Sequence, residues 1–381
     1  MRLLLFADIH IGSIKDTIYC YNVMTDIIEK EIEFKKTDAV IILGDYFDRL
    51  FRANEEFVSL AIDVMSYLVR ACSKNHTKVR LIYGTESHEM NQYKLFNHHF
   101  SSKNVDMKLI TTCTEEELFP NVNVLYVPEE YVNDKHEFYH DTLYSKKYDY
   151  IFGHGNIVEG MPMNMVFHTT TKKSLEKQVP RFNKGEMMNA SKLCIFGHIH
   201  TFKNLDNRVY YLGSLFRNSF GEEESKGYGI IEDNKLIFVE NNEAYIYKTY
   251  EFNPDSNVYE SNENIVNMIN DIKKENESIF NGEKVGKIRI IFNTPSNLDP
   301  SFNNNIKDIL SNDNLISPLI KESNRELLDE IKDEVSDEYE FILDNSMNII
   351  DKIHAFISKV NDSDIIPLNE LTNYIKNPLE I

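Results

Sequence analysis

Two histidines separated by one residue, His198 and His200, are the side chains whose spacing first indicates chemistry. They follow the apolar run Leu193–Phe196 and Gly197, so a buried strand is expected to end directly before them. Alternate side chains of an extended chain point the same way, and both imidazoles can therefore face one site. A single buried histidine is usually a core residue. The pair indicates a metal site if other strand ends supply further ligands.

Polar side chains follow apolar strands at several other places, each within a few residues of the end of the strand. They are Asp8, His10, Asp45, Asp48, His88 and His154. Because the carboxyl ends of parallel strands meet at one edge of a sheet, we expect these side chains to lie together. Carboxylates mixed with neutral imidazoles suit Mn, Fe or Zn rather than an all-oxygen Ca or Mg cage. The set is too large for one tetrahedral ion and predicts two ions, roughly 3.5–4 Å apart, that act on a phosphate.

The elements that position these residues alternate between strands and helices. Apolar runs predict buried strands at Arg2–Ala7, Ala39–Leu43 and Val79–Tyr83. Amphipathic spacing predicts helices over Tyr19–Phe34 and Phe57–Cys72. This order predicts an α/β fold with a largely parallel core and ligands at the carboxyl ends of its strands.

Shorter strands follow in the next part of the chain. We expect them at Val122–Val127, Tyr148–Phe152, Val209–Leu212, Gly227–Ile231 and Leu236–Glu240. The polar segment 156–192 predicts loops and a short helix over the site. Arg217 and Asn218 lie in a polar loop between two of these strands, and we expect them to contact the substrate.

Composition and charge restrict the partners. The chain has 381 residues, 42% of them hydrophobic, which is enough for more than one domain. Its formal net charge is −20, whereas proteins that bind DNA without a partner usually carry a net positive charge or a basic patch. Any DNA contacts must therefore be local, metal-assisted or supplied by a partner. The four cysteines form no C-x-x-C pair, which fits a reducing compartment. No apolar stretch reaches the roughly 18 residues needed for a membrane span.

The composition changes near Asp255. Helical spacing over Ser261–Glu277 and Asn303–Leu310, with a strand at Lys287–Phe292 between them, predicts a small second domain. Charged helical stretches follow, and their charge is typical of a solvated face. An apolar stripe within them makes a partner-binding surface an equal alternative. We expect a domain at 1–250 that carries the strand-end residues, a small second domain at 251–322 and a helical segment at 323–381 that packs on a partner.

The motifs D-x-H, G-D-x-x-D, a turn from Gly to His-Glu, G-H-G and G-H-x-H, in this order, resemble the calcineurin-like metallophosphoesterases. Within that family, the start L-L-F-A-D-I-H-I-G, the turn Gly44–Asp48 and the stretch Tyr211–Ser214 are most similar to the Mre11/SbcD nucleases and their phage relatives. The likeness covers about residues 1–240. It implies a two-sheet sandwich flanked by helices, followed by a small α/β capping domain that contacts DNA and a C-terminal helical segment.

The resemblance also implies a role for each strand-end residue. By position, one metal would be held by Asp8, His10 and His200, and the other by His154 and His198. Asp45 would bridge both ions, and His88 would be the catalytic acid or would stabilise the transition state. Asp48 would orient His88 or a ligand.

One turn departs from the family pattern. The family turn carries an Asn that binds the second metal, whereas Gly84–Glu89 is longer and reads G-T-E-S-H-E. Ser87, directly before His88, is the predicted substitute ligand. Glu86 would be a stronger ligand if the loop admits it.

These expectations combine into a metal-dependent phosphodiesterase that acts as a DNA exonuclease or endonuclease subunit in repair or recombination. Its cofactors would be two divalent ions, with Mn favoured and Mg, Fe or Zn as alternatives. Its partners would be DNA, an SbcC/Rad50-like ATPase bound through the C-terminal helices, and a second copy of the chain. We expect a cytoplasmic location, in the host cell if the gene is viral. Two other functions remain open: hydrolysis of small or phosphoprotein phosphodiesters, and a weakly catalytic structural adaptor of an SMC-like ATPase.

Overall fold

The computed structural model describes residues 1–101, 104–161, 179–295, 301–310 and 313–322. The predicted helical segment at 323–381 lies outside the described residues, as does part of the expected loop segment, at 162–178. The chain divides into two compact units. The first contains Met1–Thr249, Lys273–Arg289 and Leu315–Ser317, and the second contains the remaining described residues.

The first sheet has six strands in the order β14-β13-β1-β2-β3-β4. Its parallel part consists of β1 (Arg2–Phe6), β2 (Ala39–Leu43), β3 (Lys78–Ile82) and β4 (Met107–Ile110). The hairpin of β13 (Gly227–Glu232) and β14 (Lys235–Glu240) adds to the other side of β1 in the antiparallel sense. The predicted parallel core is therefore present, and β1 is one of the two central strands of the six-stranded sheet.

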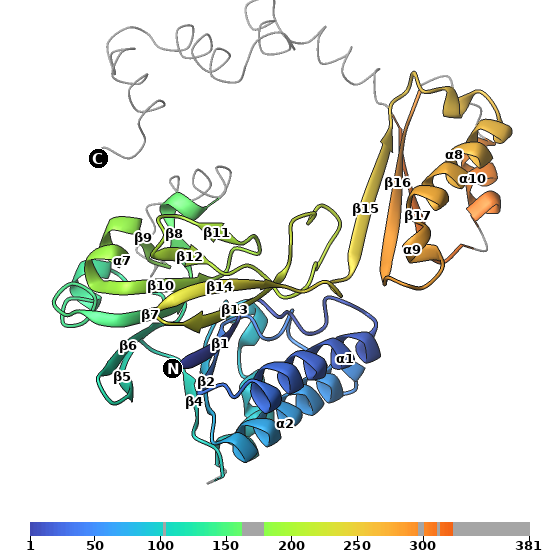
Figure 1. Cartoon of the computed structure of the whole chain (residues 1–381). Helices are drawn as coiled ribbons and strands as arrows, with labels where there is room; N and C mark the ends of the chain where they lie inside the picture. Colours follow the sequence, from blue (N-terminus) through green and yellow to red (C-terminus); the bar gives the residue numbers. More distant parts are fainter. Residues whose placement is uncertain (102–103, 162–178, 296–300, 311–312, 323–381) are drawn as a thin grey trace, which may run out of the picture. The chain divides into compact units, whose positions relative to one another are not determined.

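Helices connect the first three strands. The helix α1 (Thr17–Ile28) follows β1 and continues as the π-helix η1 (Glu29–Phe34), and α2 (Glu56–Asn75) follows β2. Both helices lie along the same face of the first sheet (Figure 1). The helix predicted over Tyr19–Phe34 is thus an α-helix that continues as a π-helix. In the π-helical turn, Glu31 is fully buried and forms ion pairs with Arg2 and Lys35.

The second sheet also has six strands, in the order β11-β12-β10-β7-β6-β5. Its parallel strands are β6 (Val122–Val127), β7 (Tyr148–His154), β10 (Ser191–Gly197) and β12 (Val209–Tyr211). The antiparallel edges are β5 (Thr114–Phe119) and β11 (Lys203–Asn204). Shorter elements complete the described part of this unit: α3 (Glu86–Glu89), η2 (Gln92–Phe96), α4 (Asn97–Phe100), α5 (Lys135–Phe138), β8 (Asn156–Ile157), η3 (Val158–Gly160), β9 (Arg181–Phe182) and α7 (Lys184–Ala190).

Alternation along the strands builds a layered core. In β1, Leu3 and Leu5 belong to the cluster between the two sheets, whereas Leu4 and Phe6 belong to the cluster under α1 and α2. On the outer face of the second sheet, a third apolar cluster includes Met187 of α7. The layers are helix, sheet, sheet and helix, which confirms the predicted two-sheet sandwich flanked by helices.

A three-stranded sheet follows in the order β15-β16-β17. Its strands are β15 (Ile246–Phe252), β16 (Gly286–Thr294) and β17 (Ile316–Glu322). The helices η4 (Asn257–Tyr259), α8 (Asn262–Glu275), α9 (Glu277–Phe280) and α10 (Phe302–Leu310) accompany it. Two helices and the strand between them were predicted, whereas β15 and β17 were not. Within the described residues, no helix has a segment long and apolar enough to span a membrane.

Candidate metal centre

The turns that follow β1 and β2 are joined by backbone hydrogen bonds that continue the strand pairing beyond both strands. The amide of Asp8 donates to the carbonyl of Gly44 at 3.3 Å, and the amide of His10 donates to the carbonyl of Asp45 at 3.0 Å. Asp8, His10 and Asp45 have φ values of 47°, 48° and 49°, and His198 has a φ of 93°. Residues other than glycine rarely adopt positive φ values unless the surrounding structure enforces them. Such residues concentrate at functional sites.

The first ligand cluster contains Asp8, His10 and His200, each with one ligand atom within 4.8 Å of the other two. The Nε2 atoms of His10 and His200 lie 3.0 Å apart. The Asp8 carboxylate accepts the backbone amide of His198 at 2.8 Å, which ties the β1 turn to the β10 turn. Residues near positions 10 and 200 are therefore brought together, as the strand-end argument predicts.

His200 is oriented from behind by two residues of the loop before β13. Its Nδ1 lies 3.4 Å from Oε1 of Glu222, which leaves Nε2 directed at His10. The buried Lys226 ammonium lies 2.6 Å from Glu222 Oε2 and donates to the carbonyl of His200 at 2.9 Å. Burial alone would raise the pKa of Glu222, but the hydrogen bond with His200 and the charge of Lys226 lower it to about 2. Glu222 therefore stays ionised beside the ring.

The second cluster contains Asp45, His154 and His198. Nδ1 of His154 lies 2.8 Å from the carbonyl of Leu43, so this nitrogen carries the hydrogen and Nε2 faces the cluster. Nε2 lies 3.4 Å from Oδ2 of Asp45. The site is closely packed, because a Cβ at Gly44 would lie 2.3 Å from Nδ1 of His154.

A third cluster, formed by His10, Asp45 and His88, joins the other two. Asp45 belongs to both the second and the third cluster, and His10 belongs to the first and the third. The rings of His10 and His88 lie 5.0 Å apart. Nδ1 of His88 is buried and has no hydrogen-bond partner among the described residues. The three clusters are therefore continuous, because His10 joins the first to the third and Asp45 joins the third to the second.

Two residues after His88 hold its turn against the Asp45 turn. The fully buried Glu89 carboxylate accepts the amides of Gly84 at 2.6 Å and Tyr46 at 2.7 Å. The amide group of Gln92 donates to the carbonyls of His88 at 2.7 Å and Arg49 at 2.9 Å. These bonds fix His88 relative to the β2 turn.

The protonation states suit divalent cations. Burial lowers the pKa of His10 to about 3 and that of His198 to about 4, so both rings are neutral, as metal ligands must be. Burial also opposes a charge on His154, but Asp45 and Asp8 raise its pKa to about 10, so without metal this ring carries a proton that a bound ion would have to displace. No lysine or arginine of the described chain forms an ion pair with Asp8 or Asp45, although both are buried. Buried carboxylates need a compensating charge, and the donor set fits metal ions.

The turn 84–89 differs from the expectation for Ser87. Ser87 and Glu86 are exposed, and the Glu86 carboxylate belongs to none of the clusters. The hydroxyl that reaches the site is that of Thr85, whose Oγ1 lies 3.3 Å from Asp45 Oδ2 and 3.4 Å from His154 Nε2. Because residues 86–89 form the single helical turn α3, Ser87 lies on its outer side while Thr85 precedes it.

The remaining predicted residues lie around the clusters. Oδ1 of Asp48 is 3.8 Å from Nδ1 of His10, so its neighbour is a ligand side chain in addition to the expected His88. Asn218 accepts a hydrogen bond from Ser13 at 2.8 Å, and its Nδ2 is buried with no hydrogen-bond partner in the described part of the chain. Arg217 donates weakly to the carbonyls of Ala244 and Tyr245, at 3.4 and 3.5 Å. A substrate role for Arg217 and Asn218 stays a prediction.

Sequence reasoning missed four side chains of this region: Thr85, Glu129, Glu222 and Lys226. Glu129 follows β6 by two residues, so the strand-end rule that selected the other residues could have selected it too. Glu222 and Lys226 lie in an irregular loop, and no periodicity in the sequence marks them.

Comparisons with known proteins agree with this geometry. The family model described as calcineurin-like phosphoesterase matches residues 1–202, more than half of the chain. No curated protein sequence matches. One solved crystal structure aligns with 63% of this chain and 98% of its own at 10% identity, and its TM-score of 0.35 is too low to support an argument. On the family match, the chain is a metal-dependent phosphoester hydrolase of the calcineurin-like phosphoesterase family.

Proposed function

We propose that the protein is a manganese-dependent DNA nuclease of the Mre11/SbcD type that works with an SbcC/Rad50-like ATPase. The observation that carries the two-metal part is the continuity of the ligand clusters through His10 and Asp45, which share the third cluster with His88. The DNA part rests on the likeness of the strand-end motifs to that branch and on the small α/β module that follows the phosphoesterase sandwich.

The residues of the site divide into metal ligands and a proton donor. Asp8, His10 and His200 would hold one ion, and His154 and His198 would hold the other, with Asp45 between them. Bound divalent ions supply Lewis acidity to a phosphoryl group and neutralise the charge that develops on its oxygens. The ring of His88 belongs to the cluster that joins the other two, and its Nδ1 has no hydrogen-bond partner among the described residues, so it could donate a proton to the leaving oxygen.

The Glu89 and Gln92 hydrogen bonds assist this proton donor. They fix the backbone on both sides of His88, so the ring keeps its position relative to Asp45 without rearrangement. Because the chain has a formal net charge of −20, most of the DNA affinity would come from the metal ions and from the ATPase partner. The partner would bind at 323–381, and a second copy of the chain would complete the complex.

The first experiment measures cleavage of linear and hairpin DNA by the full chain with Mn²⁺, with His88→Ala beside it. We expect the parent to cleave and His88→Ala to lose at least about 100-fold in rate, since general acid catalysis contributes this much. Both proteins should bind the same number of Mn²⁺ ions, which separates a lost proton donor from a lost metal site.

Two other results would redirect the proposal. Hydrolysis of bis(p-nitrophenyl) phosphate without cleavage of DNA, with or without the ATPase, would indicate a phosphodiesterase for small substrates. Failure to hydrolyse either substrate with Mn²⁺ bound and the ATPase present would indicate a structural adaptor.

A further inference from the structure

Glu129 is a buried carboxylate beside the second cluster, and none of the family motifs includes it. It lies two residues beyond β6 and is 8% exposed. Its Oε2 lies 3.4 Å from Thr85 Oγ1 and 3.7 Å from Nδ1 of His198, and its Oε1 lies 3.4 Å from the hydroxyl of Tyr131. The carboxylate therefore faces the metal centre.

Several other buried or half-buried glutamates of the described chain have the charge or the hydrogen bonds that burial requires. Glu31 pairs with Arg2 and Lys35, Glu116 with Arg80 and Lys108, and Glu222 with Lys226. Glu89 has no cation but accepts three hydrogen bonds of 2.6 to 2.7 Å. Glu129 has no lysine or arginine partner in the described residues and only two long contacts with hydroxyls. A buried carboxylate in this condition is costly unless a cation approaches it.

The position of Glu129 coincides with a gap in the ligand set. The family turn supplies an amide to the second metal, and the turn 84–89 of this chain has no Asn. Thr85, which takes the place directly after Gly84, contacts Asp45, His154 and Glu129 through the same oxygen. The hydroxyl thus connects Glu129 to the two ligands that would share the ion.

We propose that Glu129 is a ligand of the second metal ion and, together with the Thr85 hydroxyl, replaces the missing amide. The proposal rests on the two-metal part of the proposed function and is independent of the DNA substrate. A carboxylate in place of a neutral amide also changes the charge of the site. Asp8, Asp45 and Glu129 would offset three of the four positive charges of two divalent ions.

The test is a titration of the metal-depleted full chain with Mn²⁺, in which the electron paramagnetic resonance signal of free Mn²⁺ reports bound ions. The parent should bind two ions. Glu129→Gln keeps the shape of the side chain but removes its charge, and we expect one ion to bind as before and the other at least about 10-fold more weakly. Thr85→Val should weaken the same ion.

Two controls are matched in position. Glu130→Gln changes the adjacent carboxylate, which instead accepts hydrogen bonds from the Cys113 amide and the Tyr139 hydroxyl, and should bind both ions as the parent does. Ser87→Ala changes the ligand expected from sequence and should also leave binding unchanged. If Glu129→Gln does not fold, Glu129→Asp keeps the charge on a shorter side chain and should weaken the same ion.

The proposal is overturned if Glu129→Gln, folded by circular dichroism, binds both ions like Glu130→Gln. It is also overturned if Ser87→Ala loses the second ion, or if the parent binds only one. Since DNA cleavage is not measured, a chain that binds two ions through Glu129 but cuts no DNA would support this inference and contradict the nuclease proposal.

Discussion

At the scale of single residues, the metal centre depends on glycines as much as on ligands. Gly44, Gly84 and Gly197 lie where the ligand turns approach one another, and a Cβ at any of them would come within 2.4 Å of another atom. Such contacts force neighbouring groups to move, because real Cβ atoms do not approach so closely. The ligands can converge only because these three positions have no side chain.

Gly84→Ala tests this dependence. The added Cβ would lie 2.4 Å from both the amide nitrogen and Oδ1 of Asp45, so the carboxylate shared by two clusters must shift. We expect Mn²⁺ affinity to fall at least about 10-fold, measured by the same titration. Gly185→Ala in α7 is the control, since its nearest neighbour is the Asn183 side chain at 3.2 Å. Equal Mn²⁺ binding by the two variants would contradict the prediction.

The residue scale also shows the limits of sequence reasoning. Seven strand-end residues lie in the clusters because the ends of parallel strands converge on one edge: Asp8, His10, Asp45, His88, His154, His198 and His200. Ser87 was selected by its distance from His88 along the chain, which does not show that a helical turn directs it outward. Glu222 could not be predicted, because it reaches His200 through an irregular loop.

At the scale of elements, long periodic segments were predicted well, whereas several edge strands were not. The strands β1, β2 and β3 are continuous apolar runs because both faces of the sheet are covered, and α2 has a clear apolar stripe. The strand β17 reads I-S-P-L-I-K-E, and its proline argues against a strand unless the strand lies at an edge. It is an edge strand in the structure.

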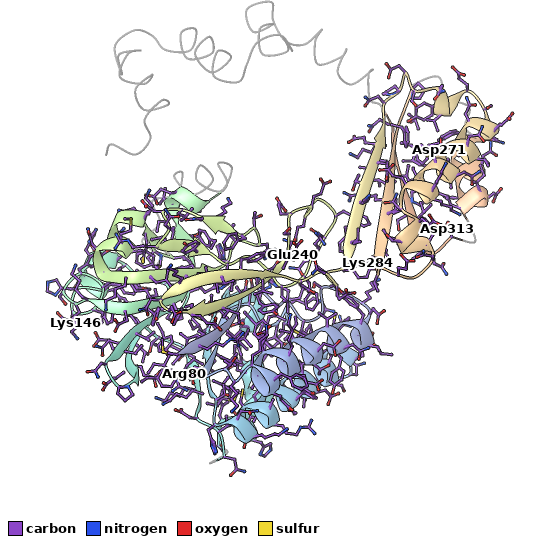
Figure 2. All side chains as sticks on the ribbon, in the orientation of Figure 1. Arg80, Lys146, Glu240, Asp271, Lys284 and Asp313 are labelled. Atoms are coloured by element: carbon purple, nitrogen blue, oxygen red, sulfur yellow. The ribbon has the colours of Figure 1, made fainter. Side chains whose placement is uncertain are left out.

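An ion pair between elements links the two large sheets. Arg80 of β3 is fully buried and binds the Glu116 carboxylate of β5 through two hydrogen bonds of 2.7 Å each. Arg80 lies in the first unit (Figure 2). Burial alone would raise the pKa of Glu116, but the hydrogen bonds from Arg80 and Lys108 lower it to about 2.

The free energy of unfolding of the first unit should therefore depend on pH, because Glu116 titrates at a lower pH in the folded chain than in the unfolded chain. Its pKa of about 2 lies below the ordinary value of 4.5, so the carboxylate stabilises the fold above about pH 4.5 and loses this effect as the pH falls towards 2. We expect Glu116→Gln to lower the free energy of unfolding by roughly 1–3 kcal/mol at pH 7, with a difference that narrows at pH 3. Urea unfolding at several pH values measures this.

Glu117→Gln is the matched control for that series. Glu117 lies next in β5 and accepts the backbone amide of Asn121 without an ion pair in the described residues. The free energy of unfolding of Glu117→Gln should equal that of the parent at every pH. A constant difference between Glu116→Gln and the parent from pH 7 to pH 3 would show that Glu116 does not titrate as described.

At the scale of the whole molecule, the acidic chain gathers several of its carboxylates in one buried region. Asp8, Asp45 and Glu129 lie there without lysine or arginine partners in the described part of the chain, and the formal net charge is already −20. Cations that bind this region should therefore stabilise the folded chain as well as supply chemistry.

Removal and return of metal tests this link. An ion present at 100 times its dissociation constant stabilises the folded state by about 2.7 kcal/mol, which corresponds to a rise in Tm of roughly 5–10 °C for a unit of this size. We expect Mn²⁺ to raise the Tm of the chelator-treated chain in calorimetry, and Asp45→Asn to reduce the rise. An unchanged Tm at saturating Mn²⁺ would contradict the prediction.

The central place of β1 has a consequence for synthesis. One neighbour of β1 is β2, but the other is β13, where Arg2 pairs with Glu232, and His10 meets a histidine 190 residues later. At about 5–20 residues per second, a nascent chain waits on the order of ten seconds for these partners. Until then one edge of β1 is open to other strands. A polypeptide that ends before residue 227 therefore carries only four of the six strands of the first sheet, and one that ends before residue 198 also lacks two of the metal-site histidines. Both should be prone to aggregation and proteolysis.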